Sequence, residues 1–264
     1  NGGLVASQQV TIMGAGGSHP SNAQTLIECS STTATVLTIA AHGCRLQGFG
    51  VRNTATDPLT AGAGIRVNAG NRMSIDDVGV FSFYIGIDVE DGAEWGMSRV
   101  HVVGFTKYGM RIAHTDLPDS GDQCISDSWV TGYAVDSDAG IYYESGGGLK
   151  LTNVKFNTGG LGKFNHAFHM ALAATTTDLL ITGCSFENSR AELVHLQQFG
   201  ASTATFNNIN ITGCQFAPYA DSVGAILVDP VNSGAHGGRP FKTLAFQGNT
   251  YLAAGGSAPA IVLT

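Results

Sequence analysis

Hydrophobic and polar residues follow a short pattern that returns eight times along the chain. Each copy has an apolar residue, a spacer, Gly, Asn or Asp, any residue, a second spacer and a final apolar residue. The copies span Leu46–Val51, Ile75–Val80, Met97–Val102, Ile125–Val130, Leu151–Phe156, Ile181–Phe186, Ile211–Phe216 and Phe246–Tyr251. Only Arg99 departs from the rule at the third position. Because the copies begin 22 to 35 residues apart, they predict stacked supersecondary units.

A second pattern lies between these copies, in which a mostly small residue precedes alternating apolar positions. It spans Gly64–Val67, Gly86–Val89, Gly109–Ile112, Gly140–Tyr143, Ala167–Met170, Leu193–Leu196, Ala225–Val228 and Ala260–Leu263. Each repeat therefore holds two runs of period two, which is typical of half-buried strands. No segment combines a long 3.6-residue period with helix caps, so long helices are not expected.

Short strands, unequal loops and 36 glycines without a collagen-like period favour an all-β fold, a parallel β-helix. An up-and-down barrel or a sandwich would not explain such unequal loops between regular runs. In a β-helix, equivalent inward residues stack at the spacing of neighbouring strands, roughly 4.8 Å. One ladder should contain Phe156, Phe186, Phe216 and Tyr251, and another should contain Cys184 and Cys214.

The opening segments Val10–Gly16, Thr25–Glu28 and Val36–Ile39 resemble the first rungs of pectin-lyase-like β-helix proteins. Within that superfamily the chain is most similar to bacteriophage tail spikes that bind and degrade bacterial surface polysaccharides. The resemblance runs from about residue 10 to 264 and implies a single-stranded, right-handed coil of about 8–10 rungs. It also implies a homotrimer located in the virion tail or outside the cell. No catalytic signature accompanies it, so no catalytic residue is carried over.

Composition narrows the choice of partners. Charged residues make up 12% of the chain, the net charge is −7, and basic residues are not clustered, which argues against nucleic acid. No signal peptide or membrane-length apolar run is visible, so no membrane partner is expected. We expect residues 1–264 to form one domain, and a chain that opens at Asn1 without Met to be a piece of a longer protein.

Metal and cofactor chemistry finds little support in the sequence. The five cysteines, Cys29, Cys44, Cys124, Cys184 and Cys214, show no CxxC spacing, and their odd number argues against a complete disulfide framework. Cys184 and Cys214 should be buried thiols, with a disulfide as the alternative. The loop His114–Asp122 could bind calcium through its three aspartates, but Pro, Ser and Gly explain it as a turn. No metal and no cofactor are predicted.

Outward positions of the second strand form a polar and aromatic row. Read along the stack, its pairs are Arg66/Asn68, Asp88/Glu90, Arg111/Ala113, Tyr142/Glu144, His169/Ala171, His195/Gln197 and Leu227/Asp229. Planar hydrogen-bonding groups beside flat rings suit a sugar, so Arg66, Arg111, Tyr142, His169 and His195 are predicted to bind substrate. The alternative is an ordinary solvated face in which Asp88 relieves the repulsion between two arginines.

Three carboxylates in this row are the catalytic candidates. Glu90 and Glu144 lie two rungs apart, roughly 9.6 Å by strand spacing. Inverting glycosidases hold their carboxyls about 6.5–9.5 Å apart so that a water fits between them. Asp88, two residues before Glu90, is the candidate helper or replacement.

The first strand has its own outward column, which contains Gly79, His101, Trp129, Lys155, Ser185 and Gln215. An outward Trp129 is either a platform for a sugar ring or part of a subunit interface, and His101 beside it is a further substrate-binding candidate. The favoured function is a hydrolase of bacterial surface polysaccharide. The alternatives are a polysaccharide lyase whose base is His101, Arg111, Tyr142 or His169, and a non-catalytic binding or structural shaft.

Overall fold

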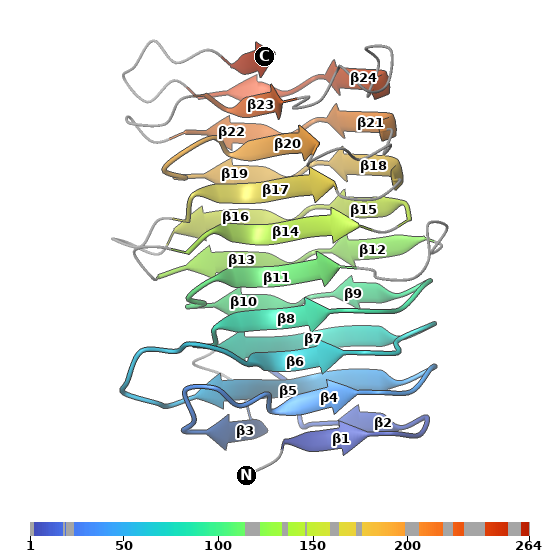
Figure 1. Ribbon diagram of the computed structural model, residues 1–264, viewed down its shortest axis with the longest axis vertical. Helices are drawn as coiled ribbons and strands as arrows, with labels where there is room; N and C mark the ends of the chain where they lie inside the picture. Colours follow the sequence, from blue (N-terminus) through green and yellow to red (C-terminus); the bar gives the residue numbers. More distant parts are fainter. Residues whose placement is uncertain are drawn as a thin grey trace.

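The computed structural model describes most of the chain, and β-strands are the only regular structure in the residues that it describes (Figure 1). The described residues are 3–17, 19, 24–113, 122–133, 137–145, 147–158, 164–172, 176–198, 206–218, 224–229, 241–252 and 260–263. Within these ranges there is no helix long and apolar enough to cross a membrane. The prediction of an all-β fold is confirmed.

The strands form two sheets. The ten-stranded sheet contains β1 (Leu4–Ala6), β4 (Leu37–Ile39), β6 (Ala63–Val67), β8 (Ile85–Val89), β11 (Tyr108–Ala113), β14 (Ala139–Ser145), β17 (His166–Leu172), β20 (Val194–Gln198), β23 (Ile226–Asp229) and β26 (Ile261–Leu263). The sixteen-stranded sheet contains β2 (Thr11–Met13), β3 (Leu26–Cys29), β5 (Arg45–Asn53), β7 (Ser74–Phe81), β9 (Gly96–Ser98), β10 (His101–Val103), β12 (Gln123–Ser126), β13 (Trp129–Gly132), β15 (Leu149–Thr152), β16 (Lys155–Thr158), β18 (Thr176–Thr182), β19 (Ser185–Glu187), β21 (Phe206–Thr212), β22 (Gln215–Ala217), β24 (Phe241–Gln247) and β25 (Thr250–Tyr251).

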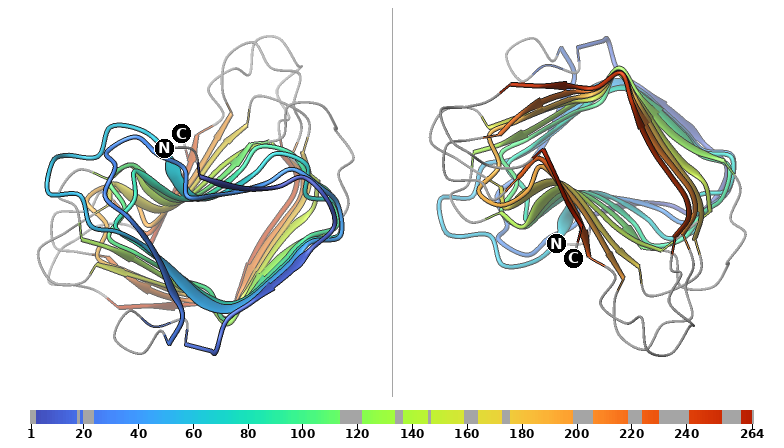
Figure 2. Two further views of the ribbon diagram at one scale, coloured as in Figure 1. Left: turned by 90° about the horizontal axis from the view of Figure 1, so that it is seen from below. Right: turned by 90° about the horizontal axis from the view of Figure 1, so that it is seen from above.

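All described strand pairs are parallel, and neighbouring strands come from successive passes of the chain. The long strand β7 joins two columns of the larger sheet, because its start pairs with β9 and its end pairs with β10. Figure 2, which looks along the stack, shows the strands superposed around one core. This arrangement is consistent with the predicted parallel β-solenoid.

The eight-copy motif is explained by one backbone conformation. Its third residue has a φ between 49° and 72° in all eight copies. These residues are Gly48, Asp77, Arg99, Asp127, Asn153, Gly183, Gly213 and Gly248. Glycine, Asn and Asp enter this left-handed region most easily. The pattern therefore marks the bend between two strands, and Arg99 occupies it despite its side chain.

The small residues of the second pattern lie where neighbouring backbones approach closely. A Cβ built on Gly86 would lie 2.4 Å from the carbonyl oxygen of Gly109 and 2.3 Å from Cγ1 of Val102. One built on Gly109 would lie 2.5 Å from the carbonyl oxygen of Gly140. Gly109 lies at a corner where the strand bends. Tyr108 and Arg111 therefore both point outward although they are three residues apart, while Met110 is buried.

The core is built from the predicted ladders. Phe156, Phe186 and Phe216 are fully buried and stack in turn on one another and on Tyr251, with ring centroids 4.9, 5.0 and 5.2 Å apart. Cys184 lies beside this ladder as a buried free thiol, as does Cys214. Both ladder predictions are confirmed, and the disulfide alternative is not formed.

Candidate functional site

The outward row of the ten-stranded sheet has the predicted register. Arg66 pairs with Asp88, and each next member pairs with the one before it through Arg111, Tyr142, His169, His195 and Leu227. Parallel pairing without offset places these side chains directly above one another. The row divides into a charged part on β6 to β14 and an aromatic and histidine part on β11 to β20.

The charged part is an alternating chain of three carboxylates and two guanidinium groups, which we call the charged row. In spatial order it contains Glu90, Arg66, Asp88, Arg111 and Glu144. Arg66 lies 3.5 Å from Glu90 and 3.4 Å from Asp88. Arg111 lies 3.2 Å from Asp88 and 3.6 Å from Glu144. Each arginine thus bridges two carboxylates, and the two glutamates form the ends of the chain.

Asp88 is the buried centre of the charged row. Its side chain has no exposed surface, and Nη1 of Arg111 donates to both of its oxygens at 3.2 and 3.4 Å. Burial raises the pKa of this carboxyl, and Arg111 and Arg66 lower the pKa only in part. Asp88 offers no surface to a ligand in this conformation, and it pairs with both arginines.

Glu90 and Glu144 are the accessible carboxylates of the charged row. Their side chains are 35% and 39% exposed, respectively. The pairing of β11 with β14 shifts between Ile112 and Ala113, so Ala113 pairs with Ser145 and Glu144 lies at the irregularity. The simple two-rung register predicted for this pair therefore holds as far as Tyr142 and Tyr143 and is interrupted at Glu144.

Aromatic rings continue the row beside the charges. Tyr108 and Tyr142 stack with centroids 4.6 Å apart and an interplanar angle of 11°. The Lys107 ammonium lies 5.2 Å from the centroid of Tyr108, a cation–π distance. Burial raises the pKa of Tyr142, so its phenol stays protonated at neutral pH. Tyr108 was not predicted to belong to the row, because strict alternation counted back from Arg111 makes it an inward residue. Gly109, the small residue at the corner, is the sequence signal that could have identified Tyr108.

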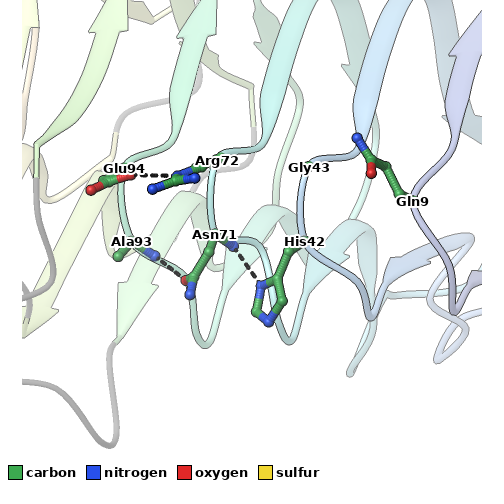
Figure 3. A pocket seen from close by; sticks show the side chains of 7 residues that line it. All are labelled: Gln9, His42, Gly43, Asn71, Arg72, Ala93 and Glu94. Atoms are coloured by element: carbon green, nitrogen blue, oxygen red, sulfur yellow. Dashed lines mark hydrogen bonds and ion pairs between the residues drawn. The ribbon is translucent and has the colours of Figure 1, made fainter.

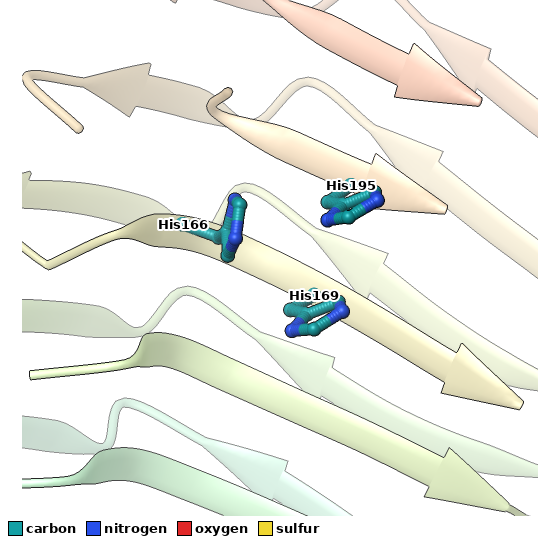
Figure 4. Close-up of side chains that lie close together, drawn as sticks. All are labelled: His166, His169 and His195. Atoms are coloured by element: carbon teal, nitrogen blue, oxygen red, sulfur yellow. The ribbon is translucent and has the colours of Figure 1, made fainter. Parts of the chain in front are cut away.

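Three histidines end the row, and we call them the histidine cluster: His166 and His169 on β17 and His195 on β20 (Figure 4). Their ring centroids lie 4.8 to 4.9 Å apart in all three pairs. Burial lowers all three pKa values, that of His169 to about 4 and that of His195 to about 3. All three imidazoles are therefore neutral at pH 7. His166 was not predicted, and it occupies the same corner position as Tyr108.

Trp129 forms a second surface, on β13 of the larger sheet. It is 48% exposed, and its ring stacks on His101 at 4.7 Å with an interplanar angle of 6°. His19 meets His101 edge-on, and Tyr133, 54% exposed, borders the same depression of about 190 Å³. We call these four residues the Trp129 shelf. The predicted outward direction of Trp129 is confirmed, and the rings of Trp129 and Tyr133 are both exposed.

A larger groove of about 510 Å³ runs over the turns that precede β5, β7 and β9 (Figure 3). Asn71 is central to it: its backbone N–H donates to Nδ1 of His42 at 3.3 Å, and its Oδ1 accepts from the backbone of Ala93 at 2.7 Å. Arg72 bonds Glu94 across the same turns at 2.9 Å. These contacts tie one turn to the next, so we assign the groove a structural role.

The loop considered for calcium lies outside the described residues except for Asp122. That carboxylate accepts a bond from the Lys150 ammonium at 3.0 Å. The contact ties β12 to β15, its neighbour in the sheet.

Fold and surface together define a class: a parallel β-solenoid protein with a charged and aromatic row on one sheet and an exposed tryptophan shelf on another. Comparisons with protein-family models, with curated proteins and with solved structures found no match.

Proposed function

We propose that this chain is a right-handed, single-domain β-helix of about 8–10 rungs that binds a bacterial surface polysaccharide and hydrolyses it. The resemblance to bacteriophage tail spikes supports this function and, with it, a homotrimer in a virion tail. The observation that carries the proposal is the charged row, in which two accessible carboxylates flank an ion-paired arginine–aspartate centre beside stacked tyrosines.

In the proposed reaction, Glu144 acts as the base and Glu90 as the acid. A water held by Glu144 attacks the anomeric carbon while the bond to the leaving oxygen breaks. The leaving oxygen takes its proton from Glu90, and Glu144 takes the proton that the water loses, so charge and atoms balance. Asp88 keeps Arg66 and Arg111 fixed between the glutamates, and the stacked rings of Tyr108 and Tyr142 support a neighbouring sugar.

The experiment is digestion of a panel of bacterial capsule and lipopolysaccharide preparations, followed by mass spectrometry of released oligosaccharides. Fragments that gain one water per cleavage are expected. Glu90→Gln and Glu144→Gln should each lower turnover by at least about 100-fold, the usual contribution of a positioned acid or base. Glu28→Gln is the matched control, because Glu28 also pairs with an arginine, Arg52, but lies on the larger sheet.

Other outcomes would change the assignment. Unsaturated fragments, lighter by one water, would replace hydrolysis by a lyase reaction and move mutagenesis to Arg111, Tyr142 and His169. Full turnover in both glutamate variants would reject the proposed pair.

Non-catalytic binding is the second candidate, and the Trp129 shelf is the observation in its favour. Trp129→Ala separates the two roles of the shelf. Loss of polysaccharide binding by an intact oligomer would identify a sugar platform, whereas dissociation of the oligomer in light scattering would identify a subunit interface.

A further inference from the structure

The histidine cluster carries an inference that does not depend on polysaccharide chemistry. One ring nitrogen from each of His166, His169 and His195 lies within 4.8 Å of the other two. Eight histidines occur in the whole chain, and these three meet at one place on two adjacent strands. We propose that they form a binding site for a first-row transition-metal dication, Zn²⁺ in particular, with three imidazole ligands and an open fourth position.

The spacing is close to that of a metal site. Zinc–nitrogen bonds of about 2.0–2.1 Å in a tetrahedral arrangement place ligand nitrogens about 3.3 Å apart. The separations within the cluster, up to 4.8 Å, require shifts of about 1 Å per ring, which side-chain torsions supply. Three nitrogen ligands with a vacant position are typical of zinc sites that bind water.

The surrounding acceptors orient two of the rings for metal binding. Nδ1 of His166 lies 3.2 Å from the backbone oxygen of Glu192, and Nε2 of His169 lies 3.2 Å from Oε1 of Gln197. Because both partners are oxygens that accept, these nitrogens carry the protons, and the other nitrogen of each ring keeps a lone pair. An acceptor on the non-ligating N–H is the usual support of a metal-bound histidine.

His195 provides an observation that supports a metal site independently of the spacing of the rings. The residue is 9% exposed, and neither of its ring nitrogens has a hydrogen-bond partner in the described part of the chain. A carboxylate oxygen of Asp229 is 4.0 Å from Nε2. A buried imidazole without a partner is costly, and a metal ion bound to one nitrogen would satisfy it. The buried carboxylate of Glu192, 3.6 Å from His166, adds negative charge beside the ion.

Zinc titration tests the site. Metal-free protein is titrated with Zn²⁺ against a chromophoric chelator, and bound metal is counted by elemental analysis. One Zn²⁺ per chain is expected. His195→Ala and His169→Ala should each weaken binding by more than about 100-fold, since loss of an outer partner alone costs 10- to 100-fold. His101→Ala, which removes a stacked histidine on the larger sheet, should bind Zn²⁺ as the unmodified chain does.

Two further measurements keep the test decisive if a ligand variant fails to fold. Gln197→Ala should weaken Zn²⁺ binding by about 10- to 100-fold, and Co²⁺ should give a tetrahedral spectrum without thiolate charge-transfer bands. No Zn²⁺ binding by the unmodified chain, binding retained in His195→Ala, or a thiolate spectrum from the cysteines would overturn the proposal. Glu90→Gln and Glu144→Gln should keep the metal, so the failure of this site and the failure of the proposed hydrolysis are distinguishable.

Discussion

At the scale of single residues, the left-handed position of the repeated motif is the clearest link between sequence and backbone. It is occupied by Gly, Asn or Asp in seven copies and by Arg99 in the eighth, all with positive φ. Arg99 remains there with an ion pair to Asp76 and a 59% exposed side chain. The conformation thus selects the residue type, and one surface contact accompanies the exception.

At Gly213 the energetic cost of the left-handed conformation can be measured without a steric clash. Its φ is 64°, and a Cβ would meet no atom within 4 Å. Gly213→Ala should therefore lower the free energy of unfolding by about 1–2 kcal/mol through backbone strain alone. Gly213→Asn should cost less, since Asn153 adopts the same conformation at φ 53°. Urea unfolding measures the free energy of unfolding of both variants. Equal losses in the two variants would show that the positive φ does not determine the cost of the substitution.

The neutral histidines predict how stability depends on pH. Burial lowers the pKa of His169 to about 4 and that of His195 to about 3, while unfolded histidine titrates near 6.5. Asp138, Glu192 and Asp229 face the cluster and favour the charged form, but burial outweighs them. The unfolded chain therefore binds more protons, and stability falls as the pH drops below about 6.5. Between pH 7 and 5 the loss should be on the order of 2–4 kcal/mol.

Denaturant unfolding in a chelator at pH 7 and pH 5 measures this loss without bound metal. His195→Gln removes one of the three titrating rings and should reduce the pH dependence by about a third to a half. A pH-independent free energy of unfolding would show that the cluster is charged, or already disrupted, in the native state.

At the scale of elements, period-two patterning was sufficient to predict strands, their order and most of their register. Apolar positions such as Ile87 and Met110 fix which face is buried, and a one-residue slip would turn Asp88 and Arg111 inward. The sequence pattern alone therefore predicts which residues form the outward row.

The misses at this scale have a common origin. Tyr108 and His166 lie just before a small residue at a strand corner, where the backbone bend resets the alternation. Glu144 lies at a register shift between β11 and β14. Strict alternation of inward and outward residues holds in straight strands. The direction of a side chain beside a bend or a bulge follows only from the three-dimensional path of the backbone.

The buried state of Asp88 was a different kind of miss. An aspartate between two arginines on an outward face predicts a partly solvated ion pair, yet its side chain has no exposed surface. The stacked neighbours on adjacent strands cover it, and their packing depends on side-chain conformations that the sequence pattern does not specify.

At the scale of the whole molecule, the stacked architecture should make stability local, because the described strands of each turn pair only with strands of the turns next to it. Phe186→Ala tests this. The ring is fully buried between Phe156 and Phe216, so its removal should cost about 3–5 kcal/mol. Amide exchange, measured by mass spectrometry, should accelerate most in β16, β19 and β22, while β5 and β7 keep their protection.

Phe49→Ala is the mirror variant, since Phe49 is buried in β5, near the other end of the stack. It should accelerate exchange around β5 and β7 and leave β19 and β22 protected. If either variant instead raised exchange evenly over all strands, the solenoid would unfold as one cooperative unit. That result would reject the nearest-neighbour description. Loss of the Phe186 ring would then destabilise the strands of the charged row as strongly as the strands of its own ladder.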